Sequence, residues 1–467
     1  MSHFYRMKWQ ELYSSQRTYT KERSGQNYDA ARTSFLRDYD RLIFSSAFRR
    51  LQNKTQVFPL PGAVFVHNRL THSLEVASVG RSLGKSVGDA LAAKYDHGNG
   101  FSDFYRHELQ SVIAAACLAH DIGNPPFGHS GEEAIRIFFE ELEGEKRKIL
   151  SDHLSENQLK DLEHFEGNAN AFRIITHHYN EAESSYKLTF TTLASIIKYP
   201  CTSAEGFNKS SGLIATKKSG FFDSEIEKYL QLAETFHIPR QEGYELVYAR
   251  HPFVYLTEAA DDICYRVMDL EDAHRLNLIS LDTFKSLFLP FFEKETGYNG
   301  VDYVNKKLSE INDDNQKVQF IRAKWIGLMV QKVSDAFMQQ EQLLLEGSLQ
   351  QDLLKCLDAH ERELIAAINK FSVAHVYNSR SVLEIESAGF NVIGGLLKAF
   401  VNAVLHSKDT RSEKLLLLIP KQFPITKNEK NLYQNIQSVV DYISGMTDLY
   451  AIDIYRKITG ISIPEIK

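Results

Sequence analysis

The stretch CLAHDIGNPPFGHSGE, residues 117–132, determines how the whole chain is interpreted. An apolar, helix-like pattern ends in it at His120 and Asp121. Gly123 stands where a helix C-terminal glycine belongs, and the two prolines that follow prevent the helix from continuing. A new helix is predicted to begin at Ser130-Gly-Glu-Glu133, which has the pattern of a capping box. The stretch therefore places two histidines, an aspartate and a glutamate at the ends of two successive helices.

Helical periodicity extends outward from this stretch in both directions. Between Val76 and Leu91 apolar residues recur at three- and four-residue steps, which predicts a helix. Gly80, Gly84 and Gly88 share another face of that helix, where a neighbouring helix can approach closely. Further helices are predicted at 108–121, 168–178, 186–198, 224–236, 253–277, 301–345, 359–374, 384–405 and 430–458.

Alternating strand patterns are scarce, so we predict an all-α fold. Residues 202–222 are rich in Ser, Gly and Lys, which predicts a long loop with room for a small hairpin. The chain has 467 residues, of which 43% are hydrophobic, enough for a large buried core. We find no internal repeat and no linker, and therefore expect one large domain over residues 1–467 with irregular insertions.

Composition excludes several classes of protein. The net charge of −6 argues against a protein that coats nucleic acid, although a local basic pocket stays open. The N-terminal residues contain no apolar segment, and no run reaches the length of a membrane span, so we expect a cytoplasmic protein without a membrane partner. The four cysteines lie far apart without a CxxC pair, which excludes a disulfide framework or a cysteine-based zinc ribbon.

Three predicted helices carry candidate metal ligands. His120 and Asp121 lie at a helix C-terminus, where the unpaired carbonyl groups favour a cation. His72 lies in the first turns of the helix striped with apolar residues, and Asp261 lies in a helix with more carboxylates than a core helix tolerates. Imidazole and carboxylate together suit divalent ions, with a preference for transition metals. Taken alone, however, a His-Asp dipeptide is more often a capping or salt-bridged pair.

His129 and Glu132 form a second candidate group at the start of the next helix. Exposed backbone N–H groups at a helix N-terminus attract phosphate. A carboxylate three residues after a histidine can orient the imidazole for proton transfer. The alternative is a capping histidine followed by a first-turn glutamate that the helix dipole favours.

Six motifs in chain order resemble those of the deoxyguanosinetriphosphate triphosphohydrolase (dGTPase) family, within the HD-domain metal-dependent phosphohydrolases. The resemblance is strong over about residues 30–275 and weaker over the helical part at about 280–467. The six motifs are SSAFRRLQNKTQVF (45–58), HNRLTHSLEVA (67–77), AHDIGNPPFGHSGE (119–132), FEGNANAFRI (165–174), IIKYP (196–200) and EAADDICYRVMDLEDA (258–273).

The resemblance implies a helical HD-domain fold with additional C-terminal helices and one divalent metal ion, Mn²⁺ or Mg²⁺ or another transition metal. The implied ligands are His72, His120, Asp121 and Asp261. Asp261 is preferred over Asp262 because the family's ligand precedes a tyrosine by four residues. The implied reaction is hydrolysis of dGTP, and of other dNTPs, to a deoxynucleoside and tripolyphosphate, which regulates the dNTP pool.

The same resemblance assigns roles to further residues. His129, oriented by Glu132, is expected to handle a proton at the α-phosphate. The residues implied to bind substrate are Gln56, Arg69, His164, Asn168, Lys198, Tyr199, Tyr265 and Asp269.

Partners and alternative functions follow from the family as well. Its members form homo-oligomers, commonly hexamers, and the apolar stretch 390–405 offers surface for such contacts. One alternative is a nucleotide phosphomonoesterase or phosphodiesterase of the HD superfamily. Another is a regulatory protein that binds single-stranded nucleic acid at a local basic groove.

Overall fold

The computed structural model describes residues 6–18, 32–58, 66–95, 97–177, 186–407, 409–426 and 428–462. Over these residues the chain consists of α-helices and short 3-10 and π-helical turns. Strand-like pairing among them is limited to isolated bridges such as Cys201 with Val247. The predicted all-α fold is confirmed.

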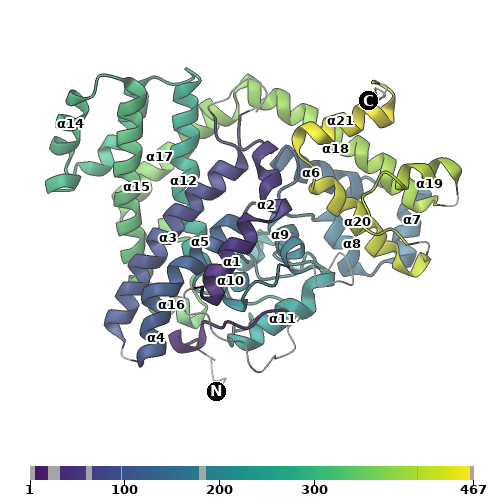
Figure 1. Cartoon of the computed structure of the whole chain (residues 1–467), viewed down its shortest axis with the longest axis horizontal. Helices are drawn as coiled ribbons and strands as arrows, with labels where there is room; N and C mark the ends of the chain where they lie inside the picture. Colours follow the sequence, from purple (N-terminus) through teal and green to yellow (C-terminus); the bar gives the residue numbers. More distant parts are fainter. Residues whose placement is uncertain are drawn as a thin grey trace.

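Four helices pack together in the left half of the view in Figure 1. They are α3 (Arg69–Lys94), α5 (Leu109–Ala119), α12 (Val254–Arg275) and α15 (Asp314–Gln339). Their apolar side chains join the larger of two principal hydrophobic clusters of the described residues. Because α3, α5 and α12 pack against one another, groups at their ends are brought together.

The contact between α3 and α5 depends on the glycine seam, which we define as Gly80, Gly84 and Gly88. A Cβ atom at Gly80 would lie 2.4 Å from the sulfur of Cys117, and one at Gly88 would lie 1.9 Å from the carbonyl oxygen of Tyr105. Both distances are far below van der Waals contact. The predicted close approach of a second helix at these glycines is therefore confirmed.

An outer layer packs around a second hydrophobic cluster. It contains α6 (His129–Glu140), α8 (Glu156–Glu163), α18 (Arg380–Leu405), α20 (Leu432–Ser444) and α21 (Asp448–Thr459). By length and composition α18 could cross a membrane, but half of its most apolar window is buried inside the protein, and a single helix of this kind is weak evidence for a membrane span. A single domain over residues 1–467 stays a prediction.

The remaining α-helices complete the two layers. Their bounds are α1 (Ser34–Ile43), α2 (Ser46–Arg50), α4 (Asn99–Asp103), α7 (Gly144–His153), α9 (Gly167–Thr176), α10 (Phe190–Ala194), α11 (Ile226–Thr235), α13 (Leu281–Phe288), α14 (Val301–Glu310), α16 (Glu341–Glu346), α17 (Ala359–Ser372) and α19 (Thr410–Leu416).

Several predicted helices are shorter or divided. The helix predicted over 301–345 is three helices, α14, α15 and α16, because the Asp313 side chain accepts a hydrogen bond from the backbone N–H of Gln316 and starts α15 afresh. The helix predicted over 430–458 is interrupted between Ser444 and Asp448. Residues 202–222 form the predicted loop, with short 3-10 turns and without the hairpin.

Candidate active site

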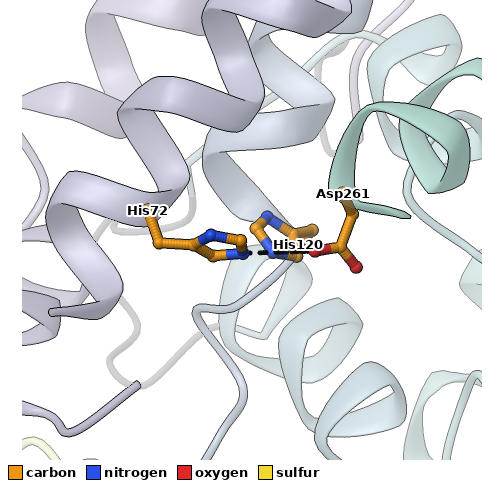
Figure 2. Close-up of side chains that lie close together, drawn as sticks. All are labelled: His72, His120 and Asp261. Carbon is orange, nitrogen blue, oxygen red and sulfur yellow. Dashed lines mark hydrogen bonds and ion pairs between the residues drawn. The ribbon is translucent and has the colours of Figure 1, made fainter. Parts of the chain in front are cut away.

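The strongest candidate metal site lies where α3, α5 and α12 meet. His72 extends from the start of α3, His120 follows the last residue of α5, and Asp261 lies on α12 (Figure 2). The distance from Asp261 Oδ1 is 3.2 Å to His72 Nε2 and 3.5 Å to His120 Nε2. All three ligand atoms lie within 4.8 Å of one another, so one ion could contact them together.

His120 is oriented as a metal ligand requires. Its Nδ1 lies 2.6 Å from the carbonyl oxygen of Cys117, so Nδ1 carries the proton and donates. Its Nε2 is buried and has no hydrogen-bond partner among the described residues. Nε2 is thereby directed toward Asp261, and once deprotonated it would offer its lone pair to an ion at that position. Two imidazole nitrogens and a carboxylate oxygen fit a divalent ion of the transition-metal type.

Asp121 lies beside this cluster, and its carboxylate already has two protein partners. Oδ2 accepts a hydrogen bond from Arg69 Nη1 at 2.8 Å, and Oδ1 accepts one from the side-chain amide of Asn124. Oδ1 is also 3.5 Å from His120 Nε2. Burial raises the pKa of Asp121, but the positive charge of Arg69 outweighs it and lowers the pKa to about 2. A fourth ligand role for Asp121 stays a prediction.

Asp261 and its neighbour Asp262 have different surroundings. Lys198 donates a hydrogen bond to Asp261 Oδ2 at 2.9 Å, and its charge with that of His120 outweighs burial and lowers the pKa of Asp261. Asp262 is paired with Arg266 at 3.2 Å. Burial raises the pKa of Asp262 to about 7. Of the two aspartates, Asp261 alone belongs to the cluster around His72 and His120.

His129 and Glu132 form the second chemical group of the site. The predicted capping box at Ser130 is wrong, because α6 already begins at His129 and Gly128 occupies the N-cap with φ +58° and no side-chain cap. Glu132 is buried, and its Oε1 accepts a hydrogen bond from the backbone N–H of Gly167 at 2.9 Å. Its Oε2 lies 3.3 Å from His129 Nδ1.

The two groups of this pair differ in exposure. The His129 side chain is 87% exposed, whereas that of Glu132 is 3% exposed. The hydrogen bond and charge of Glu132 raise the pKa of His129. Burial raises the pKa of Glu132, but the His129 hydrogen bond and the charge of Lys218 prevail and lower it to about 2. Glu132 is thus a fixed anion that orients an accessible imidazole.

A pocket of about 600 Å³ contains both groups. Every residue implied to bind substrate lines it except one. The lining residues of that set are Gln56, Arg69, Asn168, Lys198, Tyr199, Tyr265 and Asp269. The exception is His164, which is absent from the lining within the described chain; its Nδ1 lies 2.9 Å from the carbonyl oxygen of Ser203 and its ring packs on Phe207. A substrate contact for His164 stays a prediction.

Sequence reasoning missed several lining residues. Tyr377 ends a π-helical turn, Val373–Tyr377, and its hydroxyl donates a hydrogen bond to Asp269 Oδ2 at 2.7 Å. Lys218, in the 202–222 loop, donates one to Glu166 Oε1 at 2.9 Å. No periodicity distinguishes a lysine in a polar loop, and Tyr377 falls where the family resemblance is weak. The outer layer adds Val382, Ile385 and Glu386 from α18.

Asp269 of α12 lines the pocket, and its carboxyl group has a raised pKa. Burial raises its pKa to about 6, although the hydrogen bond from Tyr377 and the charge of His72 act in the opposite direction. Tyr265, one turn earlier on α12, carries the guanidinium of Arg266 over its ring at 4.6 Å. A carboxylate and a phenol ring therefore stand side by side on the part of the pocket formed by α3, α5 and α12, which we call the inner wall.

Comparisons with known proteins identify related proteins over nearly the whole chain. Residues 69–200 match the HD domain model, and residues 356–457 match the model of a phosphohydrolase-associated domain. A deoxyguanosinetriphosphate triphosphohydrolase-like protein of Synechocystis sp. is 36% identical, over 98% of this chain and 100% of that protein. One of Pseudomonas aeruginosa is also 36% identical over the same shares. A deoxyguanosinetriphosphate triphosphohydrolase of Yersinia enterocolitica is 31% identical over 95% of this chain and 97% of its own length.

Proposed function

The chain belongs to the dGTPase family of HD-domain phosphohydrolases, and from this premise we propose that it hydrolyses dGTP, and other dNTPs, to a deoxynucleoside and tripolyphosphate. A divalent ion, Mn²⁺ or Mg²⁺, would serve the reaction. We further propose that the enzyme acts in the cytoplasm as a homo-oligomer and regulates the dNTP pool. The proposal rests on one observation: a single pocket contains the candidate metal ligands, the His129–Glu132 pair and the Tyr265–Asp269 pair.

The reaction first requires a polarised α-phosphate and an activated water, which the candidate metal ligands could provide through a bound ion. An ion held by His72, His120 and Asp261, with Asp121 as the proposed fourth ligand, would polarise the α-phosphate and supply an activated water. The chain's own residues keep these side chains in place before any ion binds, through the Cys117 carbonyl and the Lys198 ammonium group.

Three cationic side chains would bind the triphosphate. They are Arg69, Lys198 and Lys218, which line the pocket. The Nε of Arg69 is buried without a hydrogen-bond partner among the described residues, so the guanidinium group keeps a donor that the protein does not use. A guanidinium group and two ammonium groups can bind phosphate oxygens, and an ion held by Asp121 and Asp261 would leave Arg69 and Lys198, which are paired with these carboxylates, available to the phosphates. His129 would transfer a proton at the α-phosphate, and Glu132 would keep its imidazole ring oriented for this step.

The inner wall suits a deoxyribose. Asp269 accepts a hydrogen bond from Tyr377 on one oxygen, Oδ2. Its carboxylate can also accept one from a 3′-hydroxyl group. The neighbouring ring of Tyr265 would occupy the space of a 2′-hydroxyl group. This pair would favour deoxynucleotides over ribonucleotides, because the added hydroxyl group would have neither room nor a partner.

The side of the pocket formed by α6 and α18, which we call the outer wall, suits a guanine. Val382 and Ile385, together with Val57 next to Gln56, present apolar surface, and Glu386 is the carboxylate of α18 among the lining residues. Guanine alone of the four DNA bases offers two adjacent donors, N1–H and the N2 amino group, on one edge. A carboxylate accepts both at once, whereas it would repel the acceptor atoms of the other bases.

The experiment that tests the proposal is a product analysis. The purified protein is incubated with each dNTP and with GTP, in the presence of Mn²⁺ or Mg²⁺, and the products are identified by chromatography. Deoxyguanosine with tripolyphosphate is expected. Release of orthophosphate or diphosphate would instead indicate a phosphomonoesterase or phosphodiesterase. Metal binding without turnover of any dNTP would favour a regulatory, nucleic-acid-binding protein.

A further inference from the structure

Asp448, in the first turn of α21, connects two separate segments of the pocket. It is 4% exposed, and both of its oxygens accept hydrogen bonds. Oδ1 accepts one from the backbone N–H of Phe127 at 3.0 Å. Oδ2 accepts two from Thr55, from the backbone N–H at 2.8 Å and from the hydroxyl group at 2.6 Å. Thr55 directly precedes Gln56, and Phe127 lies two residues before His129.

The backbone at Phe127 needs such support. Its φ is +62°, in the left-handed region that an L-residue with a large side chain rarely adopts, and Gly128 follows with φ +58°. A conformation of this kind persists only where its surroundings hold it. Gly389 of α18 provides the second support, because a Cβ atom there would lie 2.5 Å from Phe127 Cβ. The outer layer thus fixes both the N–H group and the ring of Phe127.

Lys54 links the end of α20 to the turn that contains Asn124 and Phe127. Its side chain is buried, and its Nζ donates hydrogen bonds to the carbonyl oxygens of Asn124, at 2.5 Å, and Ser444, at 2.8 Å. Ser444 is the last residue of α20. Burial, together with the charges of Arg50 and Arg69, lowers the pKa of Lys54 to about 7. Hydrogen bonds from Lys54 and to Asp448 therefore hold the turn at Asn124 and at Phe127.

We propose that the α20–α21 corner, residues 444–448, is a positioning element for the reaction, with Asp448 as its principal positioning residue. By holding Phe127 in the left-handed conformation, Asp448 directs His129 into the pocket, and by holding Thr55 it places Gln56. Among the residues that the structure describes, none of the corner lines the pocket itself. The kinetic consequences rest on the proposed function, whereas the structural link does not.

The first test is the Asp448→Asn variant, in which one oxygen is replaced by an amide nitrogen that cannot accept. Its matched control is Asp453→Asn, a solvent-accessible aspartate of the same helix that is paired with Lys457. We expect kcat for dGTP to fall by about 10- to 100-fold in Asp448→Asn, since small misplacements of reacting groups have effects of this size. The control keeps its activity. Mn²⁺ binding is expected to be unchanged in both variants.

A double-mutant cycle separates positioning from a general structural effect. If Asp448 acts on kcat through His129 and on KM through the substrate-binding Gln56, then Asp448→Asn should change kcat by less than about twofold in a His129→Ala background, while its effect on KM remains. A general loss of structure would lower kcat by the same factor in both backgrounds, and that result would overturn the proposal. Gly389→Ala, which presses on the Phe127 ring from the opposite side, should reproduce the loss of kcat if Asp448→Asn fails to fold.

Hydrogen exchange provides a readout that does not depend on turnover. The Phe127 amide should be protected in the wild-type protein and should lose protection in Asp448→Ala, which removes both acceptor oxygens, whereas Asp453→Ala should leave it protected. Unchanged protection in Asp448→Ala would overturn the proposal. If the wild-type protein hydrolyses no dNTP, the proposed function fails, and the exchange experiment still decides whether Asp448 holds the turn.

Discussion

The inner wall and the outer wall of the pocket are built in different ways. The inner wall, on α3, α5 and α12, holds the proposed metal ligands, and the side chains of His72 and His120 are 2% and 4% exposed. The outer wall, on α6 and α18, presents His129 with 87% of its side chain exposed. Metal ligands must be in place before the ion binds, whereas a proton-transfer group must be accessible to the substrate. The two walls meet these two requirements separately.

The largest effects are expected from removing carboxylates at the metal cluster. Asp261→Ala and Asp121→Ala should each reduce turnover below detection, because the ion loses an anionic ligand. Metal content by elemental analysis and Mn²⁺ titration by calorimetry would check the cause. Full metal occupancy in Asp121→Ala would remove that residue from the ligand set and leave the inner wall with three ligands.

The next largest effect belongs to the outer wall. His129→Ala should keep its metal and lose about 10²- to 10⁴-fold in kcat, the usual contribution of general acid–base catalysis. The comparison variant is His153→Ala, which replaces an exposed histidine of α7. If His129→Ala also loses the metal, the assignment of metal binding to the inner wall and of proton transfer to the outer wall is wrong.

A smaller effect, with a pH signature, is expected at Asp269. Its pKa is raised to about 6 by burial, so the carboxylate is ionised above that pH and protonated below it. Because only the ionised form can accept from both Tyr377 and the 3′-hydroxyl group, KM for dGTP should rise by up to about tenfold per pH unit below pH 6. In Asp269→Asn, KM should be high at every pH. A wild-type KM that is constant from pH 5 to pH 8 would contradict this role.

The smallest effect is expected at Glu386. Glu386→Gln keeps the shape of the side chain but offers guanine one acceptor oxygen and one donor. The ratio of kcat/KM for dGTP to that for dATP should fall by about fivefold, the value of one hydrogen bond. The exposed Glu384, paired with Arg380, provides the control Glu384→Gln. An unchanged ratio would move base recognition away from the outer wall.

The sequence predicted the inner wall better than the outer one. Periodicity and glycine spacing predicted α3, and the carboxylate-rich pattern of 253–277 predicted α12, because both signals are local. The placement of Tyr377 and Glu386 depends on how distant helices pack, which no local pattern encodes. The start of α6 was misjudged for a related reason: the left-handed backbone at Phe127 and Gly128 is stabilised by Asp448, more than 300 residues away along the chain.

The glycine seam has a consequence for how metal affinity could change. His72 and His120 belong to two helices whose separation is set by the absence of side chains at Gly80, Gly84 and Gly88. A single methyl group there would force the helices apart and alter the span between two imidazoles that it never touches. Selectivity among ions of different radius is thus open to tuning by substitutions in the packed interior, and a survey of variants confined to the ligands would overlook it.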